Sequence, residues 1–203
     1  MASGHPGFPL YNGRVQLNLT STIPASFTTE RFLIRRYKVT DEELLYDAAR
    51  SSIAEVFEFL PWCHPDYSEK DASDWLASID SNWKSGSAYN FGIFDRDETE
   101  FHGGCGIGQI DEHPIGNLGY WVKTASTGQG IATEATIALA KFALGPIGLQ
   151  RIEIIMSVHN EASKRVAEAA GGKFEGTLRN RLLLHDRQHD AFSYSITPED
   201  QKI

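Results

Sequence analysis

The stretch from Gly119 to Ala135 constrains the fold most, because it is typical of a strand, a tight glycine loop and the first turn of a helix. The loop contains Gly128-Gln129-Gly130, and the helical pattern begins at Ile131. The first N–H groups of a helix have no partner within it, and the helix dipole places partial positive charge there. Glycines also let a phosphate approach the main chain without meeting Cβ atoms. The stretch therefore predicts a cradle for a pyrophosphate.

The overall charge excludes two classes of partner. The 203 residues carry a formal net charge of −8, so a general affinity for nucleic acids or for anionic membranes is not expected. Cationic partners are favoured instead. The two cysteines, Cys63 and Cys105, are too few for a disulfide framework or a cysteine zinc site, and reduced thiols are typical of a cytoplasmic protein.

The amino-terminal residues carry no recognisable targeting signal. Residues 1–20 lack the basic start and the apolar centre of a signal peptide, and no apolar run approaches the roughly 20 residues that span a bilayer. No repeat or linker interrupts the chain. We therefore expect an N-terminal arm over residues 1–27 and one domain over residues 28–203, located in the cytoplasm.

Hydrophobic periodicity predicts an alternation of strands and helices. Thr40 and Glu43 form a candidate capping box at the start of the first helix, and Asn160 is a candidate N-cap of the last. The expected strands are 31–37, 89–93, 101–110, 117–123, 151–157, 174–184 and 191–196. The expected helices are 40–49, which continues in a second helical piece over 52–59, then 68–86, 131–142 and 160–170. The order is β-αα-βββ-α-β-α-ββ. It predicts an α+β domain with a twisted, mostly antiparallel sheet of about seven strands.

Four segments after residue 117 and one before it carry a family resemblance. They are Leu118–Val122, Gly128–Ala135, Asn160–Ser163, Phe174-Glu175-Gly176 and, nearer the amino end, Phe59–Trp62. With these segments, residues 28 to 197 resemble the GCN5-related N-acetyltransferases (GNAT), and specifically their RimJ/RimL-type group, which acetylates ribosomal-protein serine and alanine N-termini. The combination is far more specific than any one segment.

The resemblance implies acetyl-CoA as co-substrate, bound in a V-shaped gap between the strand that ends at Val122 and the strand that ends near Ser157. Where neighbouring strands part, their main-chain groups can bond an extended ligand, as in strand addition. The family usually has Gln or Arg where this chain has Thr127. The expected cofactor-binding residues are Trp121, Val122, Lys123, Thr127, Gly128, Gln129, Gly130, Ile131, Ala132, Thr133, Asn160 and Ser163.

The resemblance also implies direct attack of an amine on the thioester, through an oxyanion that needs a hydrogen-bond donor. The main-chain N–H of Val122 is the expected donor. Many relatives place a tyrosine that protonates the thiolate where this chain has Ala167, and RimJ/RimL-type members present a serine, here Ser163. A serine hydroxyl is much less acidic than a thiol of pKa about 8.5, so we expect Ser163 to stabilise the thiolate rather than to protonate it.

The acceptor and the general base are less constrained. Asp111, Glu112 and His113 lie together at a strand end, and no motif selects one of them as the base. A peptide α-amine, with a pKa of about 7.7 to 8.0, needs less help than a lysine near 10.4, so a protein N-terminus is favoured as acceptor. A small amine such as a polyamine, an amino acid derivative or an antibiotic is the alternative. Trp62 is a candidate acceptor contact, because its segment borders the acceptor pocket in the resembling group.

Other interpretations of these residues are weaker. A Rossmann site requires crossover helices between parallel strands, and a nucleotide-hydrolase phosphate loop requires Lys where this chain has Ile131. Cys105 is expected to be a small core residue, and His185 and His189 to be exposed turn residues without a metal. A CoA-binding sensor that has lost catalysis is the alternative outside the enzymes, and the chain is expected to be a monomer or a homodimer.

Overall fold

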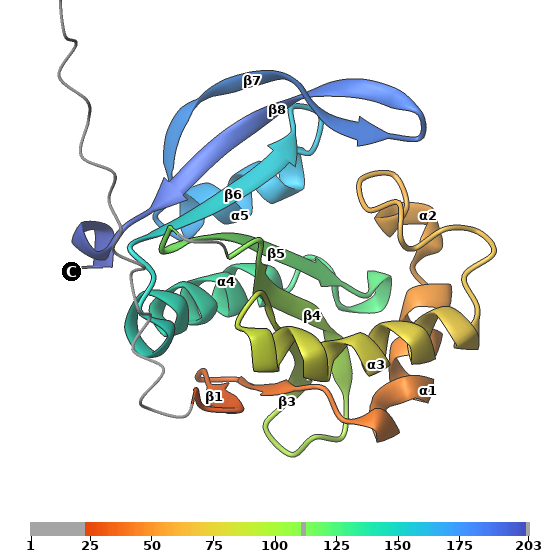
Figure 1. Ribbon diagram of the computed structural model, residues 1–203. Coiled ribbons are helices and arrows are strands. Elements are labelled where there is room, and N and C mark those ends of the chain that lie inside the picture. Colours follow the sequence, from red (N-terminus) through yellow and green to blue (C-terminus); the bar gives the residue numbers. More distant parts are fainter. Residues whose placement is uncertain (1–22, 111–112, 202–203) are drawn as a thin grey trace, which may run out of the picture.

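A computed structural model describes residues 23–110 and 113–201 as one eight-stranded sheet with helices on both of its faces (Figure 1). The strands are β1 (Ser26–Thr28), β2 (Phe32–Arg36), β3 (Tyr89–Asp95), β4 (Phe101–Gly108), β5 (Ile115–Val122), β6 (Arg151–Ser157), β7 (Lys173–Leu184) and β8 (Arg187–Ile196). The helices are α1 (Glu42–Arg50), α2 (Ile53–Val56), α3 (Glu69–Ser85), α4 (Ile131–Phe142) and α5 (Glu161–Ala169). The predicted fold class and the predicted order of helices and strands are confirmed, with one additional strand.

The sheet parts in its middle, between β5 and β6. The strand order is β1-β2-β3-β4-β5-β6-β8-β7, and every neighbouring pair is antiparallel except β5 and β6. These two strands run parallel and pair only over Ile115–Asn117 and Arg151–Glu153. Beyond these positions they no longer pair, which is the V-shaped gap that the sequence led us to expect.

Each face of the sheet has its own core. Helices α4 and α5 pack on one face, where Ile131, Leu139 and Ala167 are buried against strand residues such as Ile154. Helices α1 and α3 pack on the other face, with buried residues including Leu45, Ala72, Leu76 and Ile79. The sheet is therefore the middle of three layers, and both faces of β5 lie between helices (Figure 1).

The carboxyl-terminal hairpin reaches from the sheet to α2 (Figure 1). Its turn is His185-Asp186, and both residues have positive φ (51° and 59°), as a type I′ turn requires. The predicted turn over 185–190 was too long, because β8 begins at Arg187. His185 contacts the Phe57 ring at a centroid distance of 4.2 Å, and its Nε2 lies 3.2 Å from the carbonyl oxygen of Glu58. His185 is thus an exposed turn residue, as predicted, and it also contacts the segment that follows α2.

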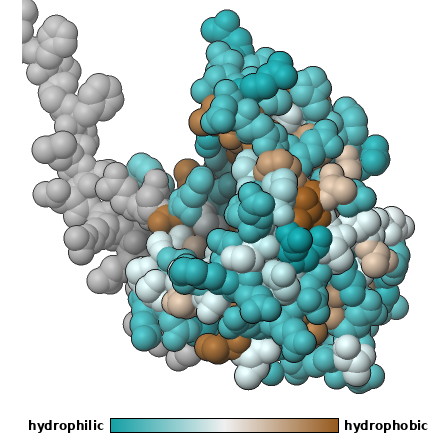
Figure 2. Space-filling model, turned by 90° about the vertical axis from the view of Figure 1, so that its right-hand side faces the viewer, coloured by the Kyte–Doolittle hydropathy of each residue, from teal (hydrophilic) through white to brown (hydrophobic). Residues whose placement is uncertain are grey.

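The surface agrees with the polar composition. On the side bordered by α2 and the hairpin tip, hydrophilic residues cover most of the surface and apolar residues show in small, separate areas (Figure 2). Across the described ranges, no helix combines the length and the apolar character that crossing a membrane requires.

Two local predictions near the amino end need correction. The capping box expected at Thr40 and Glu43 does not form, and α1 begins at Glu42. Asp41 caps this region instead, because its Oδ2 accepts from the Lys38 N–H at 2.7 Å. The strand β1 was not predicted, because three residues without marked alternation give little signal. It pairs with β2 and so brings residues 26 and 27 of the expected arm into the sheet. Residues 1–22 lie outside the described part of the chain.

Asp41 also forms a buried ion pair with Arg35. The guanidinium donates to both carboxylate oxygens, at 2.7 and 2.9 Å, and both residues are at least 90% inaccessible to solvent. Burial alone would raise the pKa of the Asp41 carboxyl, but the hydrogen bonds from Arg35 and from the Lys38 N–H hold it below its usual value. Asp41 therefore stabilises the fold in its ionised form.

We expect Asp41→Asn to lower the free energy of unfolding at pH 7 by about 3 kcal/mol, because it leaves Arg35 partly unpaired in a buried position. The carboxyl pKa is lower in the folded than in the unfolded chain, so its stabilising effect is full above the ordinary pKa of about 4 and disappears as the pH falls through the folded value. Urea unfolding at several pH values measures both effects. Asp74→Asn, at an exposed pair with Lys70, is the control. A pH-independent difference between wild type and Asp41→Asn would contradict this role.

Candidate active site

A groove of about 870 Å³ occupies the gap between β5 and β6. Helices α4 and α5 contribute their amino-terminal turns to it, and the segment around α2 and the hairpin residues Leu182 and Leu184 border it. Most of the predicted cofactor-binding residues line this groove: Trp121, Val122, Thr127, Gly128, Gly130, Ile131, Ala132, Thr133, Asn160 and Ser163. Residues separated by up to 42 positions in the chain are therefore brought to one site.

The glycine loop at one end of the groove is preformed. Gly128 and Gly130 have φ of 74° and 75°, a conformation that glycine adopts without strain. The loop is closed by Thr127, which donates from its N–H and its hydroxyl to the Thr124 carbonyl oxygen at 3.1 and 2.8 Å. Helix α4 begins at Ile131, so the first N–H groups after Gly130 lack helical partners and are free for an anion. The space beside Gly128 is open, since a Cβ there would meet nothing within 4 Å.

The Arg31 side chain lies against the same loop, and sequence reasoning missed it. Its Nε donates to Glu134 Oε2 at 2.7 Å, and one of its terminal nitrogens donates to the Gln129 carbonyl oxygen at 3.1 Å. The main-chain N–H of Arg31 donates to Glu134 Oε1 at 3.1 Å. Glu134 therefore holds a positive charge beside the cradle. Among the described residues that line the groove, Arg165 of α5 supplies a cationic side chain. No motif marked either arginine.

The register of β5 decides which main-chain groups face the gap. Lys123 donates its N–H to the His102 carbonyl oxygen at 2.8 Å, so this N–H, which we expected to be open to the ligand, is occupied. Its ammonium group pairs with Glu100 at 2.9 Å. Since hydrogen bonding alternates along an antiparallel strand, the N–H of Trp121 also points to β4, while that of Val122 points to β6 and the gap. Val122 therefore offers a free donor, and Trp121 contributes its side chain.

Ser163 lies across the gap from Val122, in the first turn of α5. Asn160 caps this helix, as predicted, because its Oδ1 accepts from the Ser163 N–H at 2.9 Å. The Ser163 hydroxyl lies 2.8 Å from the Tyr120 hydroxyl, which also donates to the Ser163 carbonyl oxygen at 3.1 Å. Burial raises the pKa of Tyr120 to about 12, so the phenol stays neutral. Tyr120 thus positions the serine, a role that the motif did not reveal.

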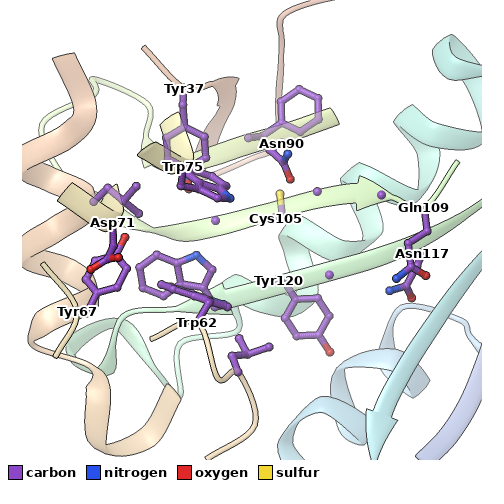
Figure 3. Close-up of a pocket in the computed structure, with 18 of the residues that line it drawn as sticks. Tyr37, Trp62, Tyr67, Asp71, Trp75, Asn90, Cys105, Gln109, Asn117 and Tyr120 are labelled. Atoms are coloured by element: carbon purple, nitrogen blue, oxygen red, sulfur yellow. The ribbon is translucent and has the colours of Figure 1, made fainter. Parts of the chain in front are cut away.

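A second cavity, of about 630 Å³, lies on the other side of β5, between the sheet and helices α1 and α3 (Figure 3). Its floor is main chain, because the cross-strand pair Gly106 and Gly119 presents no side chain. Asn117, Gly119 and Trp121 alternate along β5 toward this cavity. Both cavities share the lining residues Leu60, Gly119, Tyr120 and Trp121. They therefore meet along β5.

The other residues that the sequence suggested as site candidates lie at different positions. Trp62 lines the second cavity, whereas Asp111 and Glu112 lie outside the described residues, and His113 lines neither cavity. Cys105 is buried in the core beneath the second cavity, and burial raises the pKa of its thiol. Over residues 23–110 and 113–201, no group of three or more His, Cys, Asp or Glu side chains is arranged to hold a metal.

Comparison with known proteins agrees with this geometry. The acetyltransferase (GNAT) domain family matches residues 31–173. The chain belongs to the GNAT acetyltransferases. The ribosomal protein uS5-alanine N-acetyltransferase of Escherichia coli (strain K12) is 29% identical to this GNAT chain over 195 residues, which cover 89% of this chain and 95% of that protein.

Two solved GNAT-like structures share the fold. Mycobacterium smegmatis RimJ, in complex with a CoA disulfide, has a TM-score of 0.76 and 22% identity, covering 85% of this chain and 84% of that one. The microcin C7 self-immunity acetyltransferase MccE, in complex with acetyl-CoA and AMP, has a TM-score of 0.79 and 21% identity, covering 88% of this chain and 99% of that one. The parted strands and the glycine loop thus belong to a fold on which acetyltransferases are built.

We expect Gly119→Val to separate the two cavities of this GNAT enzyme functionally. A Cβ on Gly119 would meet nothing within 4 Å, so the strand can accept valine, and the added side chain would point into the second cavity with Asn117 and Trp121. The acceptor kcat/KM should fall about tenfold or more, while the Kd of acetyl-CoA stays within about twofold. Steady-state kinetics and calorimetry measure the two quantities. Gly145→Val, at an equally open position outside both cavities, is the control, and an equal loss of donor and acceptor binding would contradict the assignment.

Proposed function

We propose that this chain transfers the acetyl group of acetyl-CoA to the α-amine of a protein N-terminus. The observation that carries the proposal is the meeting of two cavities along β5, one beside the phosphate cradle and one on the opposite side of the strand. A donor and an acceptor can therefore approach the same stretch, Gly119–Trp121, from different sides. The relative that acetylates an alanine of ribosomal protein uS5 supports a protein N-terminus as acceptor.

The donor binds along the groove. Its diphosphate rests on the N–H groups that follow Gly128, close to the Arg31 guanidinium, and its extended arm bonds the Val122 carbonyl oxygen, which faces the gap. Acetyl-CoA supplies an activated acyl thioester. The Val122 N–H then donates to the carbonyl oxygen, on which negative charge develops as the amine attacks.

The departing sulfur is stabilised by Ser163. The Tyr120 hydroxyl lies 2.8 Å from this hydroxyl and carries one hydrogen. When that hydrogen is donated to the serine hydroxyl oxygen instead of the Ser163 carbonyl oxygen, the serine hydrogen can turn toward the thiolate. The residue at the alternative acid position, Ala167, is completely buried and has no proton to give. An α-amine of pKa about 7.7 to 8.0 is partly neutral near pH 7, so water suffices to take up the proton. A protein N-terminus as acceptor accords with the cytoplasmic location expected from the composition.

The test is release of coenzyme A from acetyl-CoA in the presence of peptides, with mass spectrometry to locate the acetyl group. Peptides with a free N-terminus should be acetylated there, and the same peptides with a formylated N-terminus and an internal lysine should not be. Modification of lysine side chains alone, or of small amines alone, would overturn the choice of acceptor. Binding of acetyl-CoA without turnover on any amine would favour the CoA-binding sensor.

We expect Ser163→Ala to lower kcat about tenfold or more and to leave the Kd of acetyl-CoA nearly unchanged, because the hydroxyl acts on the sulfur as the bond breaks. Tyr120→Phe should lower kcat less, since the serine remains and loses only its positioning partner. Single-turnover rates and calorimetric titration provide the two measurements. Equal losses of kcat and of acetyl-CoA affinity in Ser163→Ala would show that the serine only binds the donor.

A further inference from the structure

Aromatic rings gather at one end of the second cavity, where Figure 3 labels Tyr37, Trp62, Tyr67 and Trp75, and Trp121 joins them through its contact with Trp62. This aromatic end consists of Tyr37, Trp62, Tyr67, Trp75 and Trp121. The rings meet edge to face, with centroid distances of 5.0 Å for Tyr37 and Trp75, 5.3 Å for Trp62 and Trp121, and 5.7 Å for Trp62 and Tyr67. Trp62 and Trp75 stay 39% and 38% exposed, so their surfaces are available to a ligand.

A carboxylate completes this end of the cavity. Asp71 precedes Trp75 by one helical turn on α3, so the two side chains lie on the same face of the helix. Its Oδ2 accepts from the Ser68 hydroxyl at 2.6 Å and from the Ser68 N–H at 2.8 Å, and Oδ1 takes part in neither bond. These bonds hold the pKa of Asp71 below its usual value, so the group is an anion at neutral pH. Among the described residues that line the cavity there is no lysine or arginine to neutralise it.

A buried hydroxyl without a partner lies at the same end. Tyr37 is 7% exposed, and within the described chain its hydroxyl has no hydrogen-bond partner. A Cβ on Gly104 would lie 2.4 Å from this hydroxyl and 2.9 Å from Trp121 Nε1. Both polar atoms therefore lie next to Gly104, where the cavity floor has no side chain. A buried polar atom without a partner is costly, and a bound ligand would supply the missing hydrogen bond.

These three features select a cation. The faces of tryptophan and tyrosine rings attract a positive charge, and the attraction grows where water is excluded. Asp71 adds a full negative charge, and the Tyr37 oxygen can accept a hydrogen bond from an ammonium or a guanidinium group. An apolar group of the same size would leave the Asp71 carboxylate and the Tyr37 hydroxyl without a new partner, and Asp71 would repel an anion. The net charge of −8 adds a long-range attraction for cations.

We propose that the acceptor carries, besides its reacting amine, a second cationic group that binds in the aromatic end against Asp71. This inference rests on the proposed function, and for a protein N-terminus it identifies the substrate class as one with a lysine or arginine close to the reacting residue. The reacting amine lies at the shared stretch Gly119–Trp121, where the two cavities meet. The second charge thus fixes the orientation of the acceptor without taking part in the chemistry.

The experiment compares peptides that differ at one position among the first three residues. Lysine, norleucine, phenylalanine and glutamate are placed there in turn, and kcat/KM is measured for each. At the preferred position lysine should exceed norleucine about tenfold, which corresponds to about 1.4 kcal/mol, and glutamate should be lowest. Asp71→Asn keeps an oxygen for Ser68 and should remove about tenfold from the lysine peptide only. Asp74→Asn, on the same helix and bonded to Lys70, is the matched control and should leave all four values unchanged.

Each outcome separates this inference from the proposed function. Acetylation of all four N-termini with equal values for lysine and norleucine, or with a preference for phenylalanine, would overturn the inference and leave N-terminal acetylation standing. A lysine preference that survives in Asp71→Asn would also overturn it. If no peptide is acetylated, the proposed function fails, and the inference is then judged on 1,5-diaminopentane against pentylamine as acceptors. Because the diamine carries two equivalent amines, transfer to it that is well above twofold faster supports the inference, whereas a ratio of about two or less, or no transfer to either, overturns it.

Discussion

The separation of β5 from β6 after three paired positions is the constraint on which the rest of the structure depends. A strand inside a sheet ordinarily bonds its N–H and C=O groups to two neighbouring strands, and a buried main-chain group without a partner lowers the stability of the fold. Here β5 keeps β4 on one side and, within residues 23–110 and 113–201, has no strand partner on the other side beyond Asn117, so its outward groups need another partner. The groove between the strands, the cradle that follows β5 and the serine on α5 are all arranged around this opening.

The second cavity depends on a different property of the same strands. Glycines 104, 106, 108 and 119 all line it, and a side chain at 104 or 106 would run into Tyr37 or Asn90 at 2.4 to 2.6 Å. A sheet normally covers its face with side chains, and here that covering is missing over several neighbouring residues. The helices α1 and α3 supply the walls instead. The cavity is therefore a consequence of composition in β4 and β5 as much as of the helices above them.

The local parts of this arrangement could be predicted from the sequence. The glycine loop, the Asn160 cap and the mostly antiparallel order follow from residue types at short spacing, and a loop before a helix carries its own anion-binding groups. Arg31, Tyr120 and the aromatic end, apart from Trp62, escaped prediction because their roles come from contacts between distant segments. Arg31 meets Glu134 across 103 positions, and Tyr120 meets Ser163 across 43. The direction of the Lys123 N–H was mistaken because a strand's hydrogen-bonding phase depends on its partner, which periodicity does not specify.

The placement of the two cavities on opposite sides of β5 also governs how spent molecules depart. The groove is bordered by the amino-terminal turns of α4 and α5, and the second cavity by α1 and α3, so different helices border the two cavities. Under the proposed function, coenzyme A and the acetylated chain therefore occupy separate cavities that meet only along β5. The order in which the two products depart then depends on their relative affinities.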